Sequence, residues 1–430
     1  MRRALLAVAI LLLLLLPASA GAAADPRRGE QWNLDMIGSD AAHATARGAG
    51  AVIAVVDSGV QRTHPDLAGR LLPGTDIVDG GPPDDGDGHG THVSGIAVAA
   101  TGNGTGIASV APSAKILPVR VLDDSGAGTS EDVAAGIDYA RRSGADVINL
   151  SLGSEIPIIG AAGGDEIDAA IRRALAAGIV VVAAAGNNGV PVCEQPAADD
   201  GLLCVGAVDK RRQHSFFSSF GEGLGVVAPG GSALPMSGED ILSTVPPSTY
   251  GEMAGTSQAS PHVAGVAALL VSQGVRGQAA VRRIIATATD LGPAGNDPEY
   301  GHGLVNARAA VAGLAGGGPP TGTGSPAGSR RPLSPFVRVK RRQRARTVLR
   351  RGIRLRARSV AAGRARVRVV ARGRLIARGS RRLRAERTAT VVARLTRRGR
   401  RMARGRPLRA RVRVRLPGER RDRVRAIRVR

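Results

Sequence analysis

The sequence predicts an α/β domain built on a doubly wound parallel sheet, followed by a linker and a small all-β domain. Three observations support this order within the 430 residues. Strand-length apolar runs alternate with helix-like stretches over residues 31–314, which is typical of parallel α/β folds. Residues 315–335 are rich in Gly, Pro and Ser, as flexible linkers are. Arg alternates with aliphatic residues over residues 336–430.

The N-terminus has the pattern of a secretory signal peptide, which we assign to residues 1–20. Arg2 and Arg3 precede the apolar run Ala4–Leu16, and Pro17–Ala20 provides an A-x-A-type cleavage site. The apolar run is too short for a predicted membrane span, and no later segment suggests one. We therefore expect an exported protein that is secreted or attached to the cell surface.

Strand-length apolar runs recur through the first domain, which at roughly 285 residues is long enough for one large core. The predicted strands are Val52–Asp57, Ile116–Val121, Val147–Leu150, Ile179–Ala183, Leu202–Val208 and Gly225–Ala228. Helix-like stretches lie between several of them, for example Ser130–Arg142 and Glu166–Ala177. This alternation predicts the parallel sheet.

Ser257 lies in the segment GTSQASPHVAG, immediately before an apolar run that predicts a buried helix. Unpaired N–H groups and the helix dipole favour negative charge at the N-terminus of a helix. A nucleophile in acyl transfer needs such a position, because its tetrahedral intermediate is an oxyanion. An ordinary helix cap is the alternative interpretation.

Three other segments carry candidate partners of this serine. Asp57 ends the strand-like run VIAVVDSG, at the edge where parallel sheets gather catalytic groups, although it could simply cap a turn. His89 lies in the glycine-rich segment DGDGHGTHVSG, and a zinc pair with His92 lacks support from an HExxH pattern or a cysteine cluster. Asn187 follows the strand-like run VVVAAAGNNG, where its amide could donate a hydrogen bond to an oxyanion.

Together these motifs resemble those of the subtilisin family of serine proteases, peptidase family S8, over about residues 30–314. The resemblance implies that Ser257 is the nucleophile, that His89 is the general base and later acid, and that Asp57 orients the imidazole. It implies that Asn187 and the backbone N–H of Ser257 bind the oxyanion. The expected function is hydrolysis of protein or peptide substrates through an acyl-enzyme, and the alternative is a binding or scaffold protein on the same fold.

The resemblance also implies where substrate binds. The segments Leu150–Ser154 and Gly126–Gly128 resemble those that pair with an extended substrate and wall the S1 pocket, with strand end and turn as the alternative. The implied substrate-binding residues are Ser151, Leu152, Gly153, Gly126, Gly128, Ala184 and Gly186. Glu194 falls near the implied pocket floor, where a carboxylate would favour a basic P1 side chain, unless it is a solvent-facing loop residue.

A structural calcium site follows from the same resemblance. Its implied ligands are Asp66, Thr101, Asn103, Thr105 and Ile107, which supply the oxygen atoms that Ca²⁺ prefers. The loop Asp84–Asp87, DDGD, is either a second ion site or a solvated acidic turn. Gln258 stands where the family usually has methionine, which is an oxidation target, so we expect tolerance to peroxide.

Cys193 and Cys204 are the only cysteines, and they bracket one loop. In an exported protein we expect a disulfide between them, with two buried free thiols as the alternative. Residues 21–30 are too few for the N-terminal propeptide domain that secreted subtilases usually carry. The resemblance therefore leaves three routes to a folded enzyme: unaided folding, a separate partner, or help from the C-terminal region.

The last part of the chain is strongly basic. Residues 336–430 hold 38 Lys and Arg against three Asp and Glu, a net charge of +35, so residues 1–335 carry −10 of the chain's +25. Arg alternates with aliphatic residues in Val337–Lys340, Ile353–Arg358, Arg364–Val370, Arg411–Leu416 and Arg423–Arg430. This period of two predicts six or seven half-buried strands in a small, immunoglobulin-like β-sandwich. Disorder is the alternative, because a high net charge opposes compaction.

Arginine-rich faces suit an anionic partner, for which we expect cell-wall polymers or acidic lipid head groups. Nucleic acid is not expected, because Phe336 is the only aromatic residue after the linker and because the protein is exported. Genomic composition is the alternative explanation, since the chain has 57 Arg and only three Lys. If Glu194 selects arginine, the tail is also a substrate for self-cleavage. We expect the protein to be a monomer.

Overall fold

The computed structural model describes most of the chain, and it divides into two compact units that are treated separately below. Its described residues are 24–152, 164–199, 201–234, 238–314, 336–339, 342–343, 348–349, 353–358, 363–371, 374–383, 389–403, 408–416 and 423–429. The predicted signal peptide, the predicted linker and Gly153 lie outside them.

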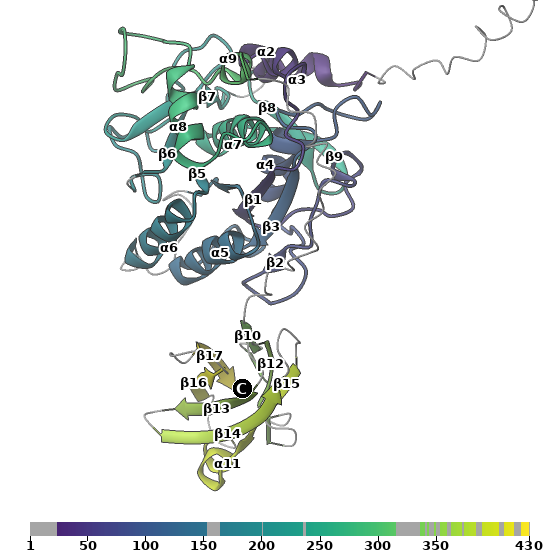
Figure 1. The fold of residues 1–430 in the computed structure, drawn as a ribbon, viewed down its shortest axis with the longest axis vertical. Coiled ribbons are helices and arrows are strands. Elements are labelled where there is room, and N and C mark those ends of the chain that lie inside the picture. The colour runs from purple at the N-terminus through teal and green to yellow at the C-terminus, as the bar shows by residue number, and fades with distance from the viewer. Residues whose placement is uncertain are drawn as a thin grey trace, which may run out of the picture. The chain divides into compact units, whose positions relative to one another are not determined.

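A seven-stranded sheet forms the centre of the larger unit, in the order β2-β3-β1-β4-β5-β6-β7 (Figure 1). The strands are β1 (Val52–Asp57), β2 (Thr75–Asp76), β3 (Lys115–Arg120), β4 (Val147–Leu150), β5 (Val180–Ala184), β6 (Leu203–Val208) and β7 (Leu224–Pro229). The pairings from β3 through to β7 are all parallel. The predicted doubly wound parallel sheet is therefore confirmed.

Helices cover both faces of this sheet (Figure 1). The main helices are α4 (His89–Val98), α5 (Ser130–Arg142), α6 (Gly164–Ala176), α7 (Thr256–Ser272) and α8 (Gly277–Ala286). Shorter turns and helices are η1 (Arg28–Glu30), α2 (Trp32–Met36), α3 (Ser39–His43), η2 (Pro65–Leu67) and α9 (Ala307–Val311). Helix α7 is buried along almost its whole length, as its apolar sequence predicts.

The chain order of the strands places the candidate site. From β1 the chain proceeds to β2 and β3 on one side, and then crosses to β4 on the other side of β1. In open parallel sheets, ligands bind at the carboxyl ends of the strands that flank such a reversal. Asp57 is the last residue of β1 and therefore lies at this point.

One further feature of the larger unit was not predicted, and one was. Strands β8 (Ile241–Val245) and β9 (Thr249–Met253) form an antiparallel hairpin that precedes α7. Cys193 and Cys204 form the expected disulfide, which ties the loop after β5 to strand β6. Within the described part of the chain, no helix combines the length and the apolar character that crossing a membrane requires.

The second unit contains an eight-stranded sheet in the order β10-β12-β15-β14-β13-β16-β17-β11. Its strands are β10 (Phe336–Val339), β11 (Arg342–Gln343), β12 (Ile353–Arg358), β13 (Gly363–Ala371), β14 (Arg374–Leu383), β15 (Ala389–Leu395), β16 (Leu408–Arg415) and β17 (Arg423–Val429). A helix, α11 (Arg397–Ala403), follows β15. The five predicted runs correspond to β10, β12, β13, β16 and β17, but this sheet has eight strands where six or seven were expected. An immunoglobulin-like identity stays a prediction.

Candidate active site

Asp57 is held rigidly at the centre of the sheet. Its strand β1 pairs with β3 on one side and with β4 on the other, and its side chain is completely buried. The carboxylate oxygen Oδ1 accepts hydrogen bonds from the backbone N–H of Ser58 (2.7 Å) and from Nδ1 of His89 (2.8 Å). The position of the histidine ring therefore follows from the position of a central strand.

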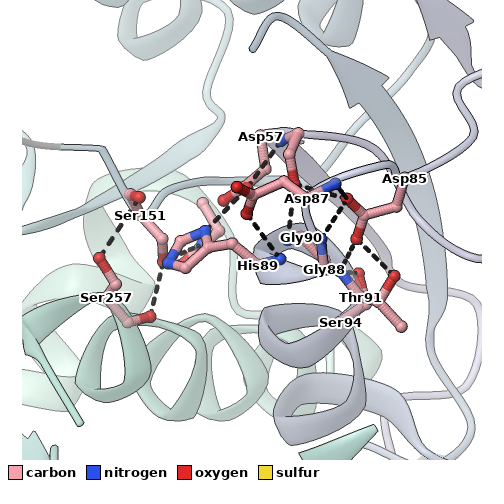
Figure 2. A network of polar contacts seen from close by, with 12 residues as sticks. Asp57, Asp85, Asp87, Gly88, His89, Gly90, Thr91, Ser94, Ser151 and Ser257 are labelled. Carbon is pink, nitrogen blue, oxygen red and sulfur yellow. Dashed lines mark hydrogen bonds and ion pairs between the residues drawn. The ribbon is translucent and has the colours of Figure 1, made fainter. Parts of the chain in front are cut away.

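His89 is the first residue of α4, and an acidic loop holds it in place (Figure 2). The carboxylate of Asp85 accepts five hydrogen bonds, from Ser58 Oγ, Asp87 N, Gly88 N, Thr91 N and Thr91 Oγ1. At Gly90 a side chain would overlap the carbonyl group of Gly59, so only glycine allows α4 to approach β1 this closely. In Figure 2 the imidazole lies between Asp57 on one side and Ser257 with Ser151 on the other.

The environment of His89 favours its protonated form. Burial alone would lower its pKa, but the negative charge and hydrogen bond of Asp57 outweigh this cost. Asp87 and Asp85 add smaller contributions in the same direction, and the pKa of His89 is raised above its ordinary value. A base with a raised pKa accepts a proton more readily from a nearby hydroxyl group.

Ser257 is the second residue of α7, after an N-cap glycine with a φ of 153°. Two hydrogen bonds join it to Ser151: Ser151 Oγ donates to the Ser257 carbonyl (2.8 Å), and Ser257 Oγ donates to the Ser151 carbonyl (3.4 Å). Asn149, near the end of β4, donates to Ser151 Oγ and accepts a bond from Ser260 Oγ. These buried bonds fix the start of α7 against the end of β4.

Asn187 follows β5, and Thr256 orients its amide. Asn187 Oδ1 accepts hydrogen bonds from Thr256 N (2.8 Å) and Thr256 Oγ1 (2.9 Å). Thr256 Oγ1 in turn accepts a bond from the backbone N–H of Gly186 (3.2 Å). Because the amide oxygen is committed to Thr256, the amide nitrogen is the end directed elsewhere. The sequence analysis missed Thr256, although its position next to Ser257 was a signal.

The candidate residues surround one cavity of about 520 Å³. Seven of the predicted site residues line it: His89, Ser257, Asn187, Gly126, Leu152, Ala184 and Gly186. The sequence analysis gave no cavity role to Asp87, Leu122, Ser125, Met253, Ala254, Thr256 or Gln258, which complete the lining. Asp57 lies behind the imidazole and supports it from the protein interior.

Three predicted substrate-binding residues are not among the described residues that line the cavity. Ser151 is completely buried, and its side chain supports the backbone of Ser257. Gly128 packs against Leu122, which lines the cavity itself. The carboxylate of Glu194 accepts bonds from Ser219 Oγ and from Asn188 and lies directly behind Gly186. These residues therefore act one layer behind the cavity wall.

The expected peroxide tolerance stays a prediction, and a second methionine bears on it. Gln258 is buried and lines the cavity, and its amide nitrogen lies 3.9 Å from the sulfur atom of Met253. Met253 lines the same cavity. The absence of methionine at position 258 therefore does not remove oxidisable sulfur from the site.

Four of the implied calcium ligands lie in the loop of residues 101–107, and the fifth, Asp66, is in η2 and bonds to that loop. Asp66 is buried and accepts hydrogen bonds from the amide of Asn103 (2.9 Å), the backbone of Ile107 (2.9 Å) and the hydroxyl of Tyr250 (3.1 Å). Asp25, which the sequence analysis missed, accepts bonds from the backbone of Gly102 and Asn103. Two buried carboxylates, Asp25 and Asp66, therefore hold the loop of residues 101–107 through hydrogen bonds.

The acidic turn Asp84–Asp87 is occupied by internal contacts. Asp84 pairs with Arg62 (2.8 Å), and Asp85 holds the histidine loop as described above. Asp87 accepts a bond from the backbone N–H of His89 (3.1 Å). Over the described residues, no group of three or more His, Cys, Asp or Glu side chains is arranged around a possible metal. These contacts favour the acidic turn over a second ion site.

The arrangement has the groups that a serine hydrolase would use. A hydroxyl group lies at a helix N-terminus, an imidazole bonded to a buried carboxylate lines the same cavity, and a side-chain amide completes the wall. A basic imidazole can remove a hydroxyl proton, and an amide N–H can stabilise an oxyanion. The fold and the site together therefore define the class of protein, which is a serine hydrolase.

Comparisons with known proteins agree. Residues 48–303 match the model of the subtilase family. Thermitase from Thermoactinomyces vulgaris is 46% identical over 65% of this chain and 95% of its own length, and subtilisin DY from Bacillus licheniformis is 40% identical over 65% and 98%. A solved protease from Pseudoalteromonas arctica aligns with a TM-score of 0.61 and 34% identity, over 68% of this chain and 100% of its own.

The chain therefore belongs to the subtilase family. It is a subtilisin-like serine endopeptidase, as the sequence motifs predicted.

Proposed function

We propose that Ser257 is the nucleophile of this peptidase, with His89 as general base and Asp57 as the residue that orients and stabilises the imidazole. The observation that carries this proposal is the 2.8 Å bond between Asp57 Oδ1 and His89 Nδ1 beside a cavity that His89 and Ser257 both line. His89 takes the Ser257 proton as the hydroxyl oxygen attacks the scissile carbonyl, and then passes it to the leaving amine. Water hydrolyses the resulting acyl-enzyme by the same steps.

Two donors serve the oxyanion in this proposal. The Asn187 amide is oriented by Thr256, and the backbone N–H of Ser257 belongs to the first turn of α7, where N–H groups have no partner within the helix. Both residues line the cavity. An extended substrate would lie along Leu152 on one side and Gly126 on the other, which also line it.

A fluorophosphonate probe, which labels activated serines, tests the proposal. The folded protein should be labelled, and the Ser257→Ala variant should lose both labelling and peptide hydrolysis. Ser125→Ala is the matched control, because Ser125 lines the same cavity and should remain dispensable for labelling. Full labelling of Ser257→Ala would refute the assignment.

We expect Asp87→Asn to shift the pH profile. Only neutral His89 can act as a base, so kcat/KM should rise with pH through a pKa above the ordinary histidine value. Asn keeps the bond to the backbone of His89 but removes a charge that raises the pKa of His89, so the rise should move to lower pH. The pH dependence of kcat/KM measures this shift.

Asp84→Asn is the control for this experiment. Asp84 lies in the same loop but pairs with Arg62, so its variant should keep the profile of the parent. If Asp87→Asn has the same pH dependence of kcat/KM as the parent, the electrostatic role given to Asp87 is wrong.

We also propose that a structural Ca²⁺ binds at the loop of residues 101–107, to which Asp25 and Asp66 are hydrogen-bonded. No cationic side chain pairs with either carboxylate among the described residues, and burial raises the pKa of Asp66. The amide nitrogen of Asn103 donates a hydrogen bond to Asp66. Rotation of this amide group by about 180° would place its oxygen atom there instead. Backbone carbonyls of the loop would complete an all-oxygen ligand set.

Chelation should lower the stability of the protein if this site binds calcium. At a calcium concentration about 100-fold above Kd, binding adds about 2.7 kcal/mol to the free energy of unfolding, and this corresponds to a Tm shift of roughly 5 °C or more. Asp66→Asn should lower the Tm and abolish its response to calcium, in a Ser257→Ala background that prevents self-digestion. Asp35→Asn, an exposed carboxylate paired with Arg28, should respond like the parent. If the Tm of the parent is the same with and without calcium, the proposed site is disproved.

The preference for a basic P1 residue stays a prediction. Because the carboxylate of Glu194 lies behind Gly186, only a long side chain would reach it from the cavity. A charge-assisted bond there would favour Arg over Phe at P1 by about 10-fold or more in kcat/KM. Peptides that differ only at P1 measure this ratio of kcat/KM values. Glu194→Gln should abolish the preference for Arg. An unchanged ratio in this variant would show that Glu194 does not determine the P1 specificity.

Export is part of the proposal. The N-terminal pattern of Arg2, Arg3 and the following apolar run supports it, as does the disulfide between Cys193 and Cys204.

A further inference from the structure

A row of exposed arginines crosses four neighbouring strands of the second unit. In the register of the sheet, Arg378 on β14 lies directly opposite Arg394 on β15 and Arg368 on β13, and Arg368 lies opposite Arg413 on β16. All four side chains are exposed. Since adjacent strands are about 4.8 Å apart, the row extends over about 14 Å. The four strands are labelled in Figure 1.

More arginines extend the row along the strands. Arg366 on β13 and Arg411 on β16 are exposed and two residues from the row, on the same face. The residues between them point to the other face, where they form the core of the unit. That core includes Val367, Val369, Val412 and Val414, which are almost completely buried. The result is one aliphatic face and one cationic face on the same strands.

The charge of this face has no acidic counterpart in the described parts of strands β10–β17. None of them contains Asp or Glu, and the three acidic residues after position 335, Glu386, Glu419 and Asp422, lie outside the described residues. Like charges directly opposite each other on adjacent strands destabilise a sheet. An anion that binds along the row would remove this repulsion.

We propose that the arginine row of Arg394, Arg378, Arg368 and Arg413 binds a linear polyanion that has repeated phosphate groups and no nucleobases. The planar guanidinium group matches a phosphate with two parallel hydrogen bonds, and a row of such groups matches a polymer better than a single ion. This surface is separate from the peptidase site, and its binding does not depend on the proposed catalytic roles.

Other anionic partners fit this face less well. Insertion into a lipid surface uses exposed aromatic or large aliphatic side chains. Among described side chains, the exposed large apolar ones are Val192, Phe216 and Leu234, all in the other unit. Single-stranded nucleic acid is held largely by base stacking on aromatic residues, and the row has none.

Long-chain inorganic polyphosphate is the probe, titrated at several salt concentrations into the full chain carrying Ser257→Ala. The triple variant R368Q/R378Q/R413Q should bind at least about 10-fold more weakly near 0.1 M salt, and the slope of log K against log salt should fall in magnitude by about 2. The control R397Q/R400Q/R401Q removes three exposed arginines from α11 and should keep most of the affinity and slope.

Thermal melts show whether the row variant is folded. Without polymer its Tm should equal or exceed that of the parent, because opposed charges have been removed. Polyphosphate should raise the Tm of the parent and of the α11 control, but not that of the row variant. No binding, or equal weakening in both triple variants, overturns the proposal. Preferential binding to phosphatidylglycerol vesicles or to oligo-dT also overturns it, in favour of a membrane or a nucleic acid.

Discussion

Replacing Asp57 with Asn should lower kcat by about four orders of magnitude at neutral pH, as loss of the triad aspartate does in serine proteases. Asn has the same shape, but it lacks the negative charge that, in the proposed mechanism, stabilises the imidazolium formed when Ser257 loses its proton. The charge is fully buried and bonded directly to His89, so water cannot replace it. Steady-state hydrolysis of a peptide substrate measures the loss.

Ser257→Ala gives the floor for this comparison, and Asp57→Asn should lie above it, because in subtilisin the loss of the aspartate costs less than the loss of the serine. Binding of a substrate-like inhibitor should be retained, because Asp57 does not line the cavity among the described residues. An Asp57→Asn enzyme within about 10-fold of the parent would contradict the catalytic assignment, since it corresponds to only about 1.4 kcal/mol of the barrier.

Replacing Asn187 with Ala should lower kcat by about 10²- to 10³-fold and change KM little, which is the range for removal of one oxyanion donor. The amide should act on the developing oxyanion more than on the bound substrate, so the loss belongs to the transition state. Separate values of kcat and KM for a peptide substrate test this expectation.

Asn188→Ala is the matched control for Asn187→Ala. Asn188 is the next residue, is absent from the described cavity lining, and bonds to Glu194. It should keep kcat within a small factor. Thr256→Val should act in the same direction as Asn187→Ala but more weakly, because it removes one of the two bonds that orient the amide. A loss confined to KM in Asn187→Ala would argue for a role in substrate binding only.

The fold of the larger unit was readable from the sequence because its strands are buried on both faces. The run Val147–Leu150 is apolar except for Asn149 and is buried throughout, and the structure has a strand with the same bounds. The β8–β9 hairpin was not readable in this way. The residues of β9, Thr249–Met253, are exposed or half-buried and carry no apolar run. The order of the strands in the sheet could not be predicted from the sequence pattern either, because it depends on tertiary packing.

Candidate site residues could be proposed from the sequence where one motif carries one chemical group, as for Asp57, His89 and Ser257. The supporting roles of other residues could not be derived from the sequence, because their partners are distant along the chain. Thr256 meets Asn187 from 69 positions away, and Ser151 meets Ser257 from 106. These pairs exist only because β4, β5 and α7 converge at one edge of the sheet.

The second unit shows a limit of the period-two pattern. Strand β14 was not predicted, because it carries an extra residue, Ile376, where its register with β13 shifts between Val369 and Val370. Ile376 and Ala377 are consecutive in sequence and yet both are buried. A bulge of this kind breaks the alternation that marks a strand in sequence.

The central place of β1 has a consequence for how activity is lost. Edge strands such as β2 and β7 can fray while the interior of the sheet keeps its hydrogen bonds. The backbone amides of β1 should exchange with deuterium only when the whole sheet opens, since the strand has neighbours on both sides. Because Asp57 ends this strand, inactivation by heat should coincide with cooperative global unfolding of the unit and not with earlier local opening.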